Sequence, residues 1–301
     1  METVKNGTIK FYVELVQLVV YIPTFTVGVI FNVLALWFAF CKIRKATETV
    51  IYVVSLIILD TLLLFTLPFK IISYHQPTWQ LGTVFCSFLE SLYFINMYGS
   101  ILISVCICVD RYIAIRHPFL AVTLRSPKKA AIICTVICSG IWAGAASTFQ
   151  LHEDSGARNS CFYGFSDKTW QSTGLFVTLE TAFLGSVATM IFCTAHIIIY
   201  LKRREDLYNP LTNTSKSVKI LTANLITFVV CFTPFHLALL LYVLVKNQVI
   251  NDSEQITRSF VQISLCWANL NCCLDAICYH FVFKESLKNM LPEHDRTISS
   301  D

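Results

Sequence analysis

VIYVVSLIILDTLLLFTLPFKIISY, residues 50–74, contains only two charged side chains, Asp60 and Lys70. A hydrocarbon core about 30 Å thick takes about 20 helical residues to cross, so this stretch is long enough to span a bilayer. Its apolar residues follow one another without alternation, which favours a helix over a strand of a membrane barrel. Six further stretches share this character, so that the candidate spans are 11–40, 50–74, 85–115, 130–150, 172–201, 217–246 and 258–283. The sequence therefore predicts an all-α membrane protein, a seven-transmembrane helix bundle.

The composition of the whole chain agrees with this prediction. Of its 301 residues, 55% are hydrophobic and 14% are charged, whereas a soluble domain carries about 25% charged residues. The loops between the spans are too short for a second domain. We therefore divide the chain into an extracellular N-terminus (1–10), a transmembrane domain (11–283) and a cytoplasmic tail (284–301). No signal peptide is recognised before the first span, which we expect to act as its own insertion signal.

The basic residues predict the orientation of the chain. With the N-terminus outside, 16 of the 23 Lys and Arg residues lie in the inner loops and tail, and seven remain outside. Positive charge is enriched on the cytoplasmic side of membrane proteins, so we expect an extracellular N-terminus and a cytoplasmic C-terminus. The net charge of +4 then reflects a basic inner face near anionic lipid rather than binding to nucleic acid.

Two of the thirteen cysteines stand apart from the rest. Eleven lie within spans or at the cytoplasmic end of one, where cysteine usually acts as a small hydrophobic residue. Cys86 and Cys161 are the two in the oxidising outer layer, and one pair allows one connectivity, so we predict a disulfide between them. Sequons on the outer side predict glycosylation at Asn6 and Asn251, whereas the topology excludes Asn213.

A series of short motifs occurs along these predicted spans and the loops between them. They are Gly28 with Asn32, Asp60, Trp79-Gln80-Leu81-Gly82 with Cys86, Asp110-Arg111-Tyr112, Phe232-Thr233-Pro234 and Asp275-Ala276-Ile277-Cys278-Tyr279. With these motifs in this order, the chain resembles a rhodopsin-like (class A) G-protein-coupled receptor along almost its full length. Three more runs resemble the subgroup that includes the lysophosphatidylinositol receptor and the kynurenate-responsive orphan receptor: Leu67-Pro68-Phe69-Lys70, Leu124-Arg125-Ser126-Pro127 and Asn271-Cys272-Cys273-Leu274-Asp275.

The chain also departs from the family pattern. Phe232 replaces the tryptophan of the sixth span, Cys138 stands where the fourth span usually has a tryptophan, and Asp275 and Ala276 replace the asparagine and proline of the seventh. No proline occurs from Lys128 to Asn209, so the fifth span lacks its usual kink. Pro234 still provides a hinge in the sixth span. These substitutions place the usual activation switch in doubt.

The resemblance implies a polar cluster near the middle of the membrane. Oxygen atoms suit a hard cation, and two carboxylates at this depth would otherwise repel each other or share a proton. The cluster is therefore a candidate sodium site, and apart from this candidate ion we expect no cofactor. A protonated, hydrogen-bonded polar core without an ion is the alternative. The residues of the cluster are Asp60, Asn96, Ser100, Asn271 and Asp275.

The resemblance also implies a coupling site for a heterotrimeric G protein at the inner end. Arg111 would pair at rest with the adjacent Asp110 and be freed when the sixth span swings outward. No acid lies between Thr214 and Lys219 to lock it further, so we expect some basal activity. The residues assigned to coupling and activation are Asp110, Arg111, Tyr112, Phe232, Pro234, Asp275 and Tyr279.

The expected ligand site lies in the outer halves of the spans. Glu90 and Tyr93 are three residues apart and share one helix face. Lys70 could pair with Glu90 and share its charge with an anionic ligand, or the pair could be purely structural. His236 could equally be a hydrogen-bonded core residue, and Arg258 could simply anchor its helix end. The predicted ligand-binding residues are Lys70, Glu90, Tyr93, Phe162, Glu180, His236, Arg258 and Gln262.

Together these features predict a plasma-membrane receptor, not an enzyme, for a small anionic or lysophospholipid-like ligand. Tyr93 stands where amine receptors carry an aspartate, and no lysine between Lys246 and Lys284 could hold retinal. Residues 281–290 predict a short amphipathic eighth helix, and the tail has few phosphate acceptors for arrestin recruitment. A chemokine-type peptide receptor and, from another class, a seven-span transporter or channel are the alternatives.

Overall fold

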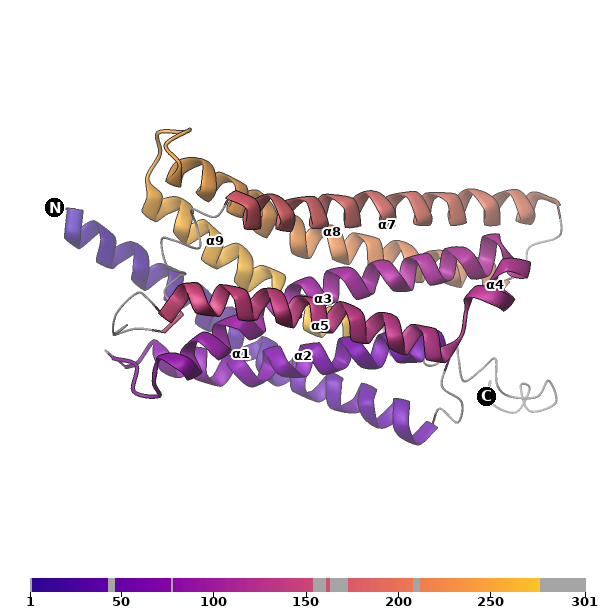
Figure 1. Cartoon of the computed structure of the whole chain (residues 1–301), viewed down its shortest axis with the longest axis horizontal. Coiled ribbons are helices and arrows are strands. Elements are labelled where there is room, and N and C mark those ends of the chain that lie inside the picture. The colour runs from indigo at the N-terminus through magenta and orange to yellow at the C-terminus, as the bar shows by residue number, and fades with distance from the viewer. Residues whose placement is uncertain are drawn as a thin grey trace.

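The computed structural model describes residues 2–42, 47–76, 78–153, 161–162, 173–207 and 212–276, and these residues form a bundle of long helices (Figure 1). Within them no strand occurs. A further helical stretch, 271–276, follows the last labelled helix after a short turn. The helices are α1 (Glu2–Lys42), α2 (Glu48–Ser73), α3 (Thr83–Arg116), α4 (Pro118–Leu124), α5 (Pro127–Glu153), α7 (Thr173–Leu207), α8 (Thr212–Lys246) and α9 (Glu254–Ala268).

Six of these helices are long and apolar enough to cross a membrane: α1, α2, α3, α5, α7 and α8. They correspond to the first six predicted spans, apart from one residue at the end of the second span and one at the start of the fifth. The seventh is represented by α9 and residues 271–276, and its remaining residues, like those of the predicted eighth helix, lie outside the described part of the chain. Two features differ from expectation. The first helix already begins at Glu2, and the loop after Arg116 contains the extra helix α4.

Local signals explain where several helices begin. The Thr47 hydroxyl accepts a hydrogen bond from the Val50 amide, which caps α2. Ser126 does the same for Lys129 in α5, where Pro127 is the first residue of the helix. Gly82 precedes α3 with a φ of +82°, a conformation that glycine adopts without strain.

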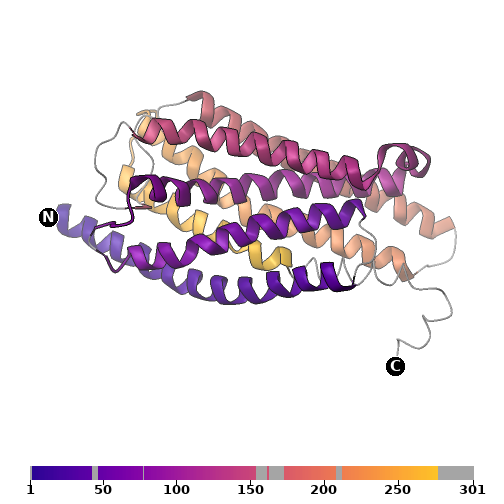
Figure 2. The same ribbon diagram turned by 60° about the horizontal axis from the view of Figure 1, so that its bottom comes forward.

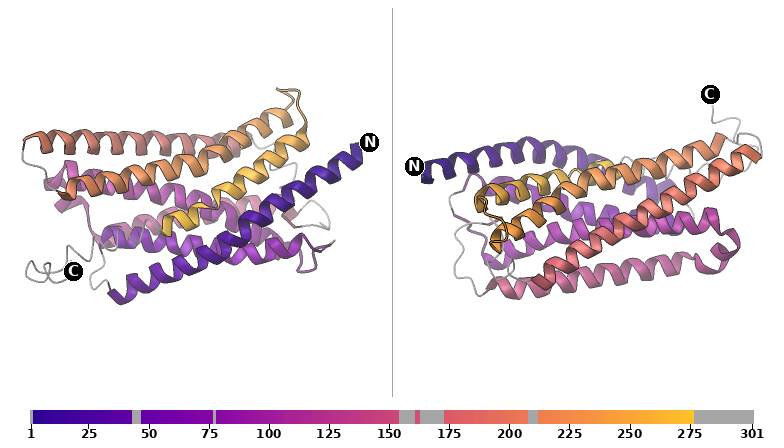
Figure 3. Two further views of the ribbon diagram at one scale, coloured as in Figure 1. Left: turned by 180° about the vertical axis from the view of Figure 1, so that it is seen from behind. Right: turned by 90° about the horizontal axis from the view of Figure 1, so that it is seen from above.

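Helix α3 lies at the centre of the bundle. It packs against α2, α5 and α7 (Figure 2), while α9 lies between α1 and α8 (Figure 3). Gly99 allows α3 to approach α2 closely, since an added Cβ would lie 2.5 Å from a methyl carbon of Leu59. Helices α5 and α7 each pack on α3 but make almost no contact with each other in the described residues.

The outside of the bundle is apolar and its interior contains polar groups. Large apolar side chains such as Phe40, Ile132 and Leu184 are exposed along the spans, whereas Asp60 and Asn96 are buried. A soluble protein rarely exposes so much continuous apolar surface, but lipid tails solvate it well. Polar groups within spans usually face the bundle interior, where they find partners. The chain is therefore a multi-pass membrane protein.

Candidate functional site

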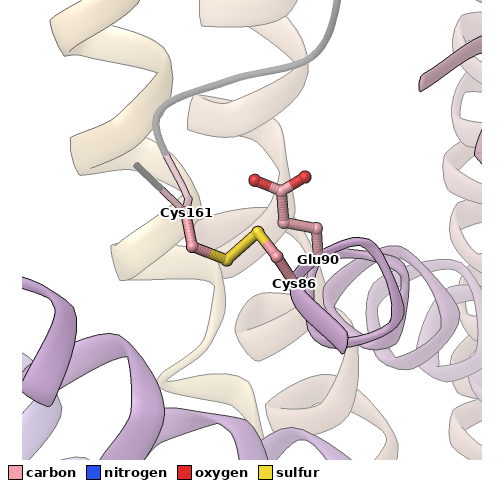
Figure 4. Close-up of side chains that lie close together, drawn as sticks. All are labelled: Cys86, Glu90 and Cys161. Carbon is pink, nitrogen blue, oxygen red and sulfur yellow. A yellow bond between two sulfur atoms is a disulfide. The ribbon is translucent and has the colours of Figure 1, made fainter. Parts of the chain in front are cut away.

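The predicted disulfide is present at one end of the bundle, here called the disulfide end. Cys86 at the start of α3 is bonded to Cys161, with the two Cα atoms 5.7 Å apart. Glu90 lies one turn further along α3, beside the two sulfur atoms (Figure 4). Its carboxylate and the cysteines are close enough to suggest a metal site. Because both thiols are used in the disulfide, this group lacks the thiolates that a metal would need.

The residue after Cys161 links two of the predicted ligand-binding side chains. The Phe162 carbonyl accepts a hydrogen bond from Lys70 Nζ at 3.2 Å, and the Phe162 amide donates to Glu90 Oε1 at 2.9 Å. Phe162 has a φ of 66°, which is unusual for a residue other than glycine. Its buried ring packs edge-on against Trp79 and Tyr93. The disulfide thus holds a backbone segment between a buried cation and a buried acid.

These groups line a cavity, called cavity 1, of about 90 Å³ at the disulfide end. Six of the eight predicted ligand-binding residues belong to its wall: Lys70, Glu90, Tyr93, Phe162, Arg258 and Gln262. Seven further wall residues, most of them aromatic or aliphatic, were not predicted from the sequence: Gln17, Tyr21, Phe94, Phe235, Tyr242, Val261 and Leu265.

Gln17 is the most informative of the residues that were missed. Its amide donates to the Gln262 carbonyl at 3.1 Å and accepts from the Tyr74 hydroxyl at 2.6 Å, so it ties α1 to α9 and to the end of α2. It is 3% exposed. A glutamine within an apolar span is an expensive group, and that signal was available in the sequence.

Glu180 and His236, the other two predicted ligand-binding residues, are not part of the wall of cavity 1. Glu180 Oε1 lies 3.1 Å from His236 Nδ1, and the imidazole stacks on the Phe183 ring at 3.8 Å. His236 is 2% exposed, and in the described structure its Nε2 has no hydrogen-bond partner. Because α7 and α8 pack against each other, the two side chains meet in their interface, away from the wall of cavity 1.

We expect replacement of Glu180 or His236 to destabilise the protein. Glu180→Leu or His236→Phe alone leaves the other polar group buried, which costs about 1–3 kcal/mol. The double variant Glu180→Leu/His236→Phe removes both groups and should cost less than the sum of the single changes. Thermal unfolding of the purified proteins measures this. The control is Thr189→Ala, at a half-buried position of α7 whose hydroxyl donates to the Gly185 carbonyl of the same helix. Additive single effects would show that the two residues do not stabilise each other.

The mid-membrane cluster is buried as predicted. Asp60 Oδ1 accepts from Asn96 Nδ2 at 3.1 Å, and Asp275 Oδ2 accepts from Asn271 Nδ2 at 2.5 Å. The two carboxyl groups are near enough to interact electrostatically. Asp60 Oδ2 and the Ser100 hydroxyl have no hydrogen-bond partner within the described residues. Two unsatisfied oxygens beside two carboxyl groups fit the requirements of a hard cation.

At the opposite end, near α4, the ion pair expected between Asp110 and Arg111 is replaced by another. Arg125 binds both carboxylate oxygens of Asp110, at 2.8 and 2.9 Å, and lies 3.2 Å from Glu48 Oε2. Helix α4 packs against α3, and Arg125 directly follows α4, which brings Arg125 to Asp110. The hydrogen bond to Asp110 is the main cause of a raised pKa for Arg125, which remains charged.

The other predicted residues have mixed positions. Tyr112 contacts the rings of Phe192 and His196 on α7. Phe232 is buried in α8, next to Pro234 within the same helix. Asn251 is exposed before α9, which is compatible with a glycan. Tyr279 and the Asn6 side chain lie outside the described residues, as do most side chains between Thr214 and Lys219.

Comparison with known proteins gives consistent matches over nearly the whole chain. Residues 31–279 match the family described as "7 transmembrane receptor (rhodopsin family)". Mouse "G-protein coupled receptor 55" is 39% identical over 284 residues, covering 89% of this chain and 86% of the relative. Human "Lysophosphatidic acid receptor 4" is 33% identical, covering 90% and 75%. Human "G-protein coupled receptor 35" is also 33% identical, covering 86% and 81%.

Proposed function

This chain belongs to the rhodopsin family of seven-transmembrane receptors, and from that premise we propose that it binds a small anionic or lysophospholipid-like ligand in cavity 1 and activates a heterotrimeric G protein. We also propose that the disulfide end faces the outside of the cell and the α4 end the cytoplasm, in the plasma membrane. The excess of basic residues in the loops at the α4 end supports this orientation. Membership of a receptor family sets aside the enzyme, transporter and channel alternatives.

The buried ammonium group of Lys70 is the observation that carries the ligand proposal. Lys70 is 7% exposed and lies in the wall of cavity 1 together with a second cation, Arg258. Among the described residues of that wall Glu90 is the one acid, and it accepts a hydrogen bond from the Phe162 amide. Cavity 1 therefore has an excess of positive charge, which favours an anionic group. One relative, human "Lysophosphatidic acid receptor 4", is named for a ligand of this chemistry.

A small aromatic acid of the kynurenate type is the second candidate ligand. Cavity 1 is small, and aromatic rings form much of its wall: Tyr21, Tyr93, Phe94, Phe162, Phe235 and Tyr242. Rings of this kind stack on an aromatic ligand. A chemokine-type peptide ligand is less well supported, because within the described residues Cys86–Cys161 is the one disulfide and the free cysteines lie on the membrane helices.

The α4 end has the character of a docking surface for a G protein. Phe119 is 93% exposed and Val122 is 83% exposed on α4, beside the bidentate pair between Asp110 and Arg125. An exposed aromatic residue next to charged groups is typical of a protein interface. Arrestin binding to the same end belongs to this proposal. Basal activity also remains a prediction, since the region expected to lack a lock is mostly outside the described residues.

A G-protein dissociation assay across all subtypes tests this function. Cells expressing the receptor are challenged with lysophosphatidylinositol, lysophosphatidic acid and kynurenate, and a response above that of mock-transfected cells is expected for at least one. Phe119→Ala should retain ligand binding and lose most of the response, because it changes the α4 end alone. Receptor at the cell surface that responds to none of these anions would refute the proposed ligand class.

We further propose that the mid-membrane cluster binds sodium, through Asp60, Ser100 and the neighbouring carboxyl and amide groups. Sodium chloride should then raise the melting temperature of the purified receptor above its value in choline chloride at equal ionic strength, because an ion that binds only the folded state stabilises it. A stabilisation of 1 kcal/mol corresponds to about 2–4 °C. The difference should vanish in Asp60→Asn. Equal melting temperatures of the wild type in the two salts would favour the ion-free polar core.

A further inference from the structure

A group of polar side chains joins the end of α8 to the start of α9 at the disulfide end of the bundle (Figure 1). Lys246 Nζ, on the last residue of α8, lies 2.7 Å from Glu254 Oε1, on the first residue of α9. The same carboxylate oxygen accepts a hydrogen bond from the Tyr242 hydroxyl at 3.4 Å. We call Tyr242, Lys246 and Glu254 the rim cluster. One carboxylate oxygen thus connects a cation and a phenol across the turn between the two helices.

The rim cluster reaches from the surface to the wall of cavity 1. Tyr242 is 4% exposed and belongs to that wall, whereas the Glu254 side chain is 50% exposed and is not one of the wall residues. Arg258, a cation of the wall, follows Glu254 by four residues and so shares its face of α9. These two charged groups and Lys246 are all near enough to Tyr242 to interact with it electrostatically. A negative charge therefore lies beside the cationic wall in which we place the anionic group of the ligand.

A carboxylate in this position repels anionic ligands to different degrees. The phosphodiester of lysophosphatidylinositol carries one negative charge, whereas a phosphate monoester such as lysophosphatidic acid carries nearly two at pH 7. The electrostatic cost of a neighbouring carboxylate grows in proportion to the charge of the ligand. Because Glu254 is half exposed, solvent reduces this cost to that of a surface charge, about threefold in affinity for each unit of charge. The cost is therefore larger for the monoester.

We propose that Glu254 is a specificity-determining residue, which disfavours a doubly charged anionic group in cavity 1 relative to a singly charged one. This inference rests on the function proposed above and concerns the charge of the ligand. The pairing of Glu254 with Lys246 acts in the same direction, because it neutralises a cation that would otherwise attract the ligand. A repulsive group of this kind is a common source of specificity, since it weakens the wrong partner more than the right one.

Glu254→Gln tests this inference in the G-protein dissociation assay. Lysophosphatidylinositol and lysophosphatidic acid with the same acyl chain are each compared on the variant and on the wild type, which cancels their partition into the membrane. The potency of the singly charged ligand should rise about threefold and that of the doubly charged ligand about tenfold, because the repulsion from the carboxylate is removed. Lysophosphatidic acid that stays silent on Glu254→Gln, or an equal gain for the two ligands, would overturn the inference.

Two matched variants are the controls, each at the surface expression of the wild type. Asp252→Asn removes an acid from the same turn, where its carboxylate accepts from the Ser253 amide at 2.7 Å, and it should leave both potencies unchanged. Glu254→Asp keeps the negative charge and should keep the wild-type preference for the singly charged ligand. If Glu254→Asp behaves like Glu254→Gln, the shape of the side chain matters rather than its charge, and the inference is wrong.

Ionic strength gives a second measurement, which a purely structural role of Glu254 would not affect. In membranes from expressing cells, the difference in potency between wild type and Glu254→Gln should shrink as choline chloride is added, because salt shortens the range over which exposed charges interact. If that difference is the same at low and high salt, or if Glu254→Gln has wild-type potencies while Lys70→Ala still weakens both ligands, the inference is wrong and the proposed function stands. If neither the wild type nor Glu254→Gln responds to any of the anions, both are wrong.

Discussion

Replacing Lys70 by alanine should lower the potency of an anionic agonist by at least about tenfold, which corresponds to about 1.4 kcal/mol. Lys70 supplies a buried ammonium group to the wall of cavity 1, and loss of a hydrogen bond to a charged group costs about 1.5–3 kcal/mol. The substitution also removes the cation from the neighbourhood of Glu90 and the Phe162 carbonyl. Dose–response curves for G-protein dissociation measure the change.

Two matched variants separate a ligand contact from a general effect of charge. Lys10→Ala removes a cation from the same end of the molecule, where it pairs at the surface with Glu14, and should leave potency unchanged. Lys70→Arg keeps the charge but alters its geometry, so an intermediate potency is expected. Surface expression is measured in parallel by antibody binding. Full potency of Lys70→Ala at normal expression would show that Lys70 does not contact the ligand.

Loss of the Cys86–Cys161 disulfide should have a still larger effect, with potency falling at least about a hundredfold or the receptor failing to reach the surface. The bond holds Phe162, whose carbonyl and amide engage Lys70 and Glu90. Phe162 also has a backbone conformation that persists only when its surroundings enforce it. Cys161→Ser therefore disturbs the cation, the acid and an aromatic part of the wall together. Potency and surface expression of Cys161→Ser are compared with wild type.

A membrane-impermeant reductant gives the same test on receptor already at the surface. It should reproduce the loss of potency in the wild type, because the disulfide is expected to face the outside. Cys138→Ser, which removes a half-buried free thiol on α5, serves as the control and should respond normally before reduction. Unchanged potency after complete reduction would mean that Phe162 keeps its position without the bond.

The spans could be predicted because they depend on local features of the sequence. The disulfide could be predicted because two cysteines alone were expected on that side of the membrane. Hydropathy is summed over consecutive residues, so a span is recognised from its own segment alone. Within lipid, such an apolar segment satisfies its backbone hydrogen bonds by forming a helix. Cys86 and Cys161 had no competitor on their side of the membrane. The ends of helices were less predictable, as the start of α1 at Glu2 and the presence of α4 show. Polar residues near an end join or leave a helix for small differences in free energy.

Most of the residues predicted to bind a ligand lie in the wall of cavity 1, and one cause explains those that do not. Lys70, Glu90 and Arg258 do share a cavity, but Glu180 and His236 pair within the α7–α8 interface. The depth of a residue in the membrane follows from its position in the span. Its direction depends on how each helix is rotated about its axis, and packing against neighbours sets that rotation. Gln17 was missed for the same reason. The rotation of α1 turns it toward Gln262 on α9, which is 245 residues away in the sequence.

The order of residues alone was enough to predict the lipid environment, the helical bundle and the Cys86–Cys161 disulfide, and it gave an expected depth for each charged group. The partners of those charges emerged from the folded arrangement. Asp110 binds Arg125 instead of the adjacent Arg111, which was the expected partner, and Glu180 pairs with His236 outside the wall of cavity 1. The physical reason is that burial in lipid acts on each segment separately, whereas an ion pair or a cavity requires several helices at defined tilts and rotations. Such contacts join residues far apart in the chain, and no local pattern encodes them.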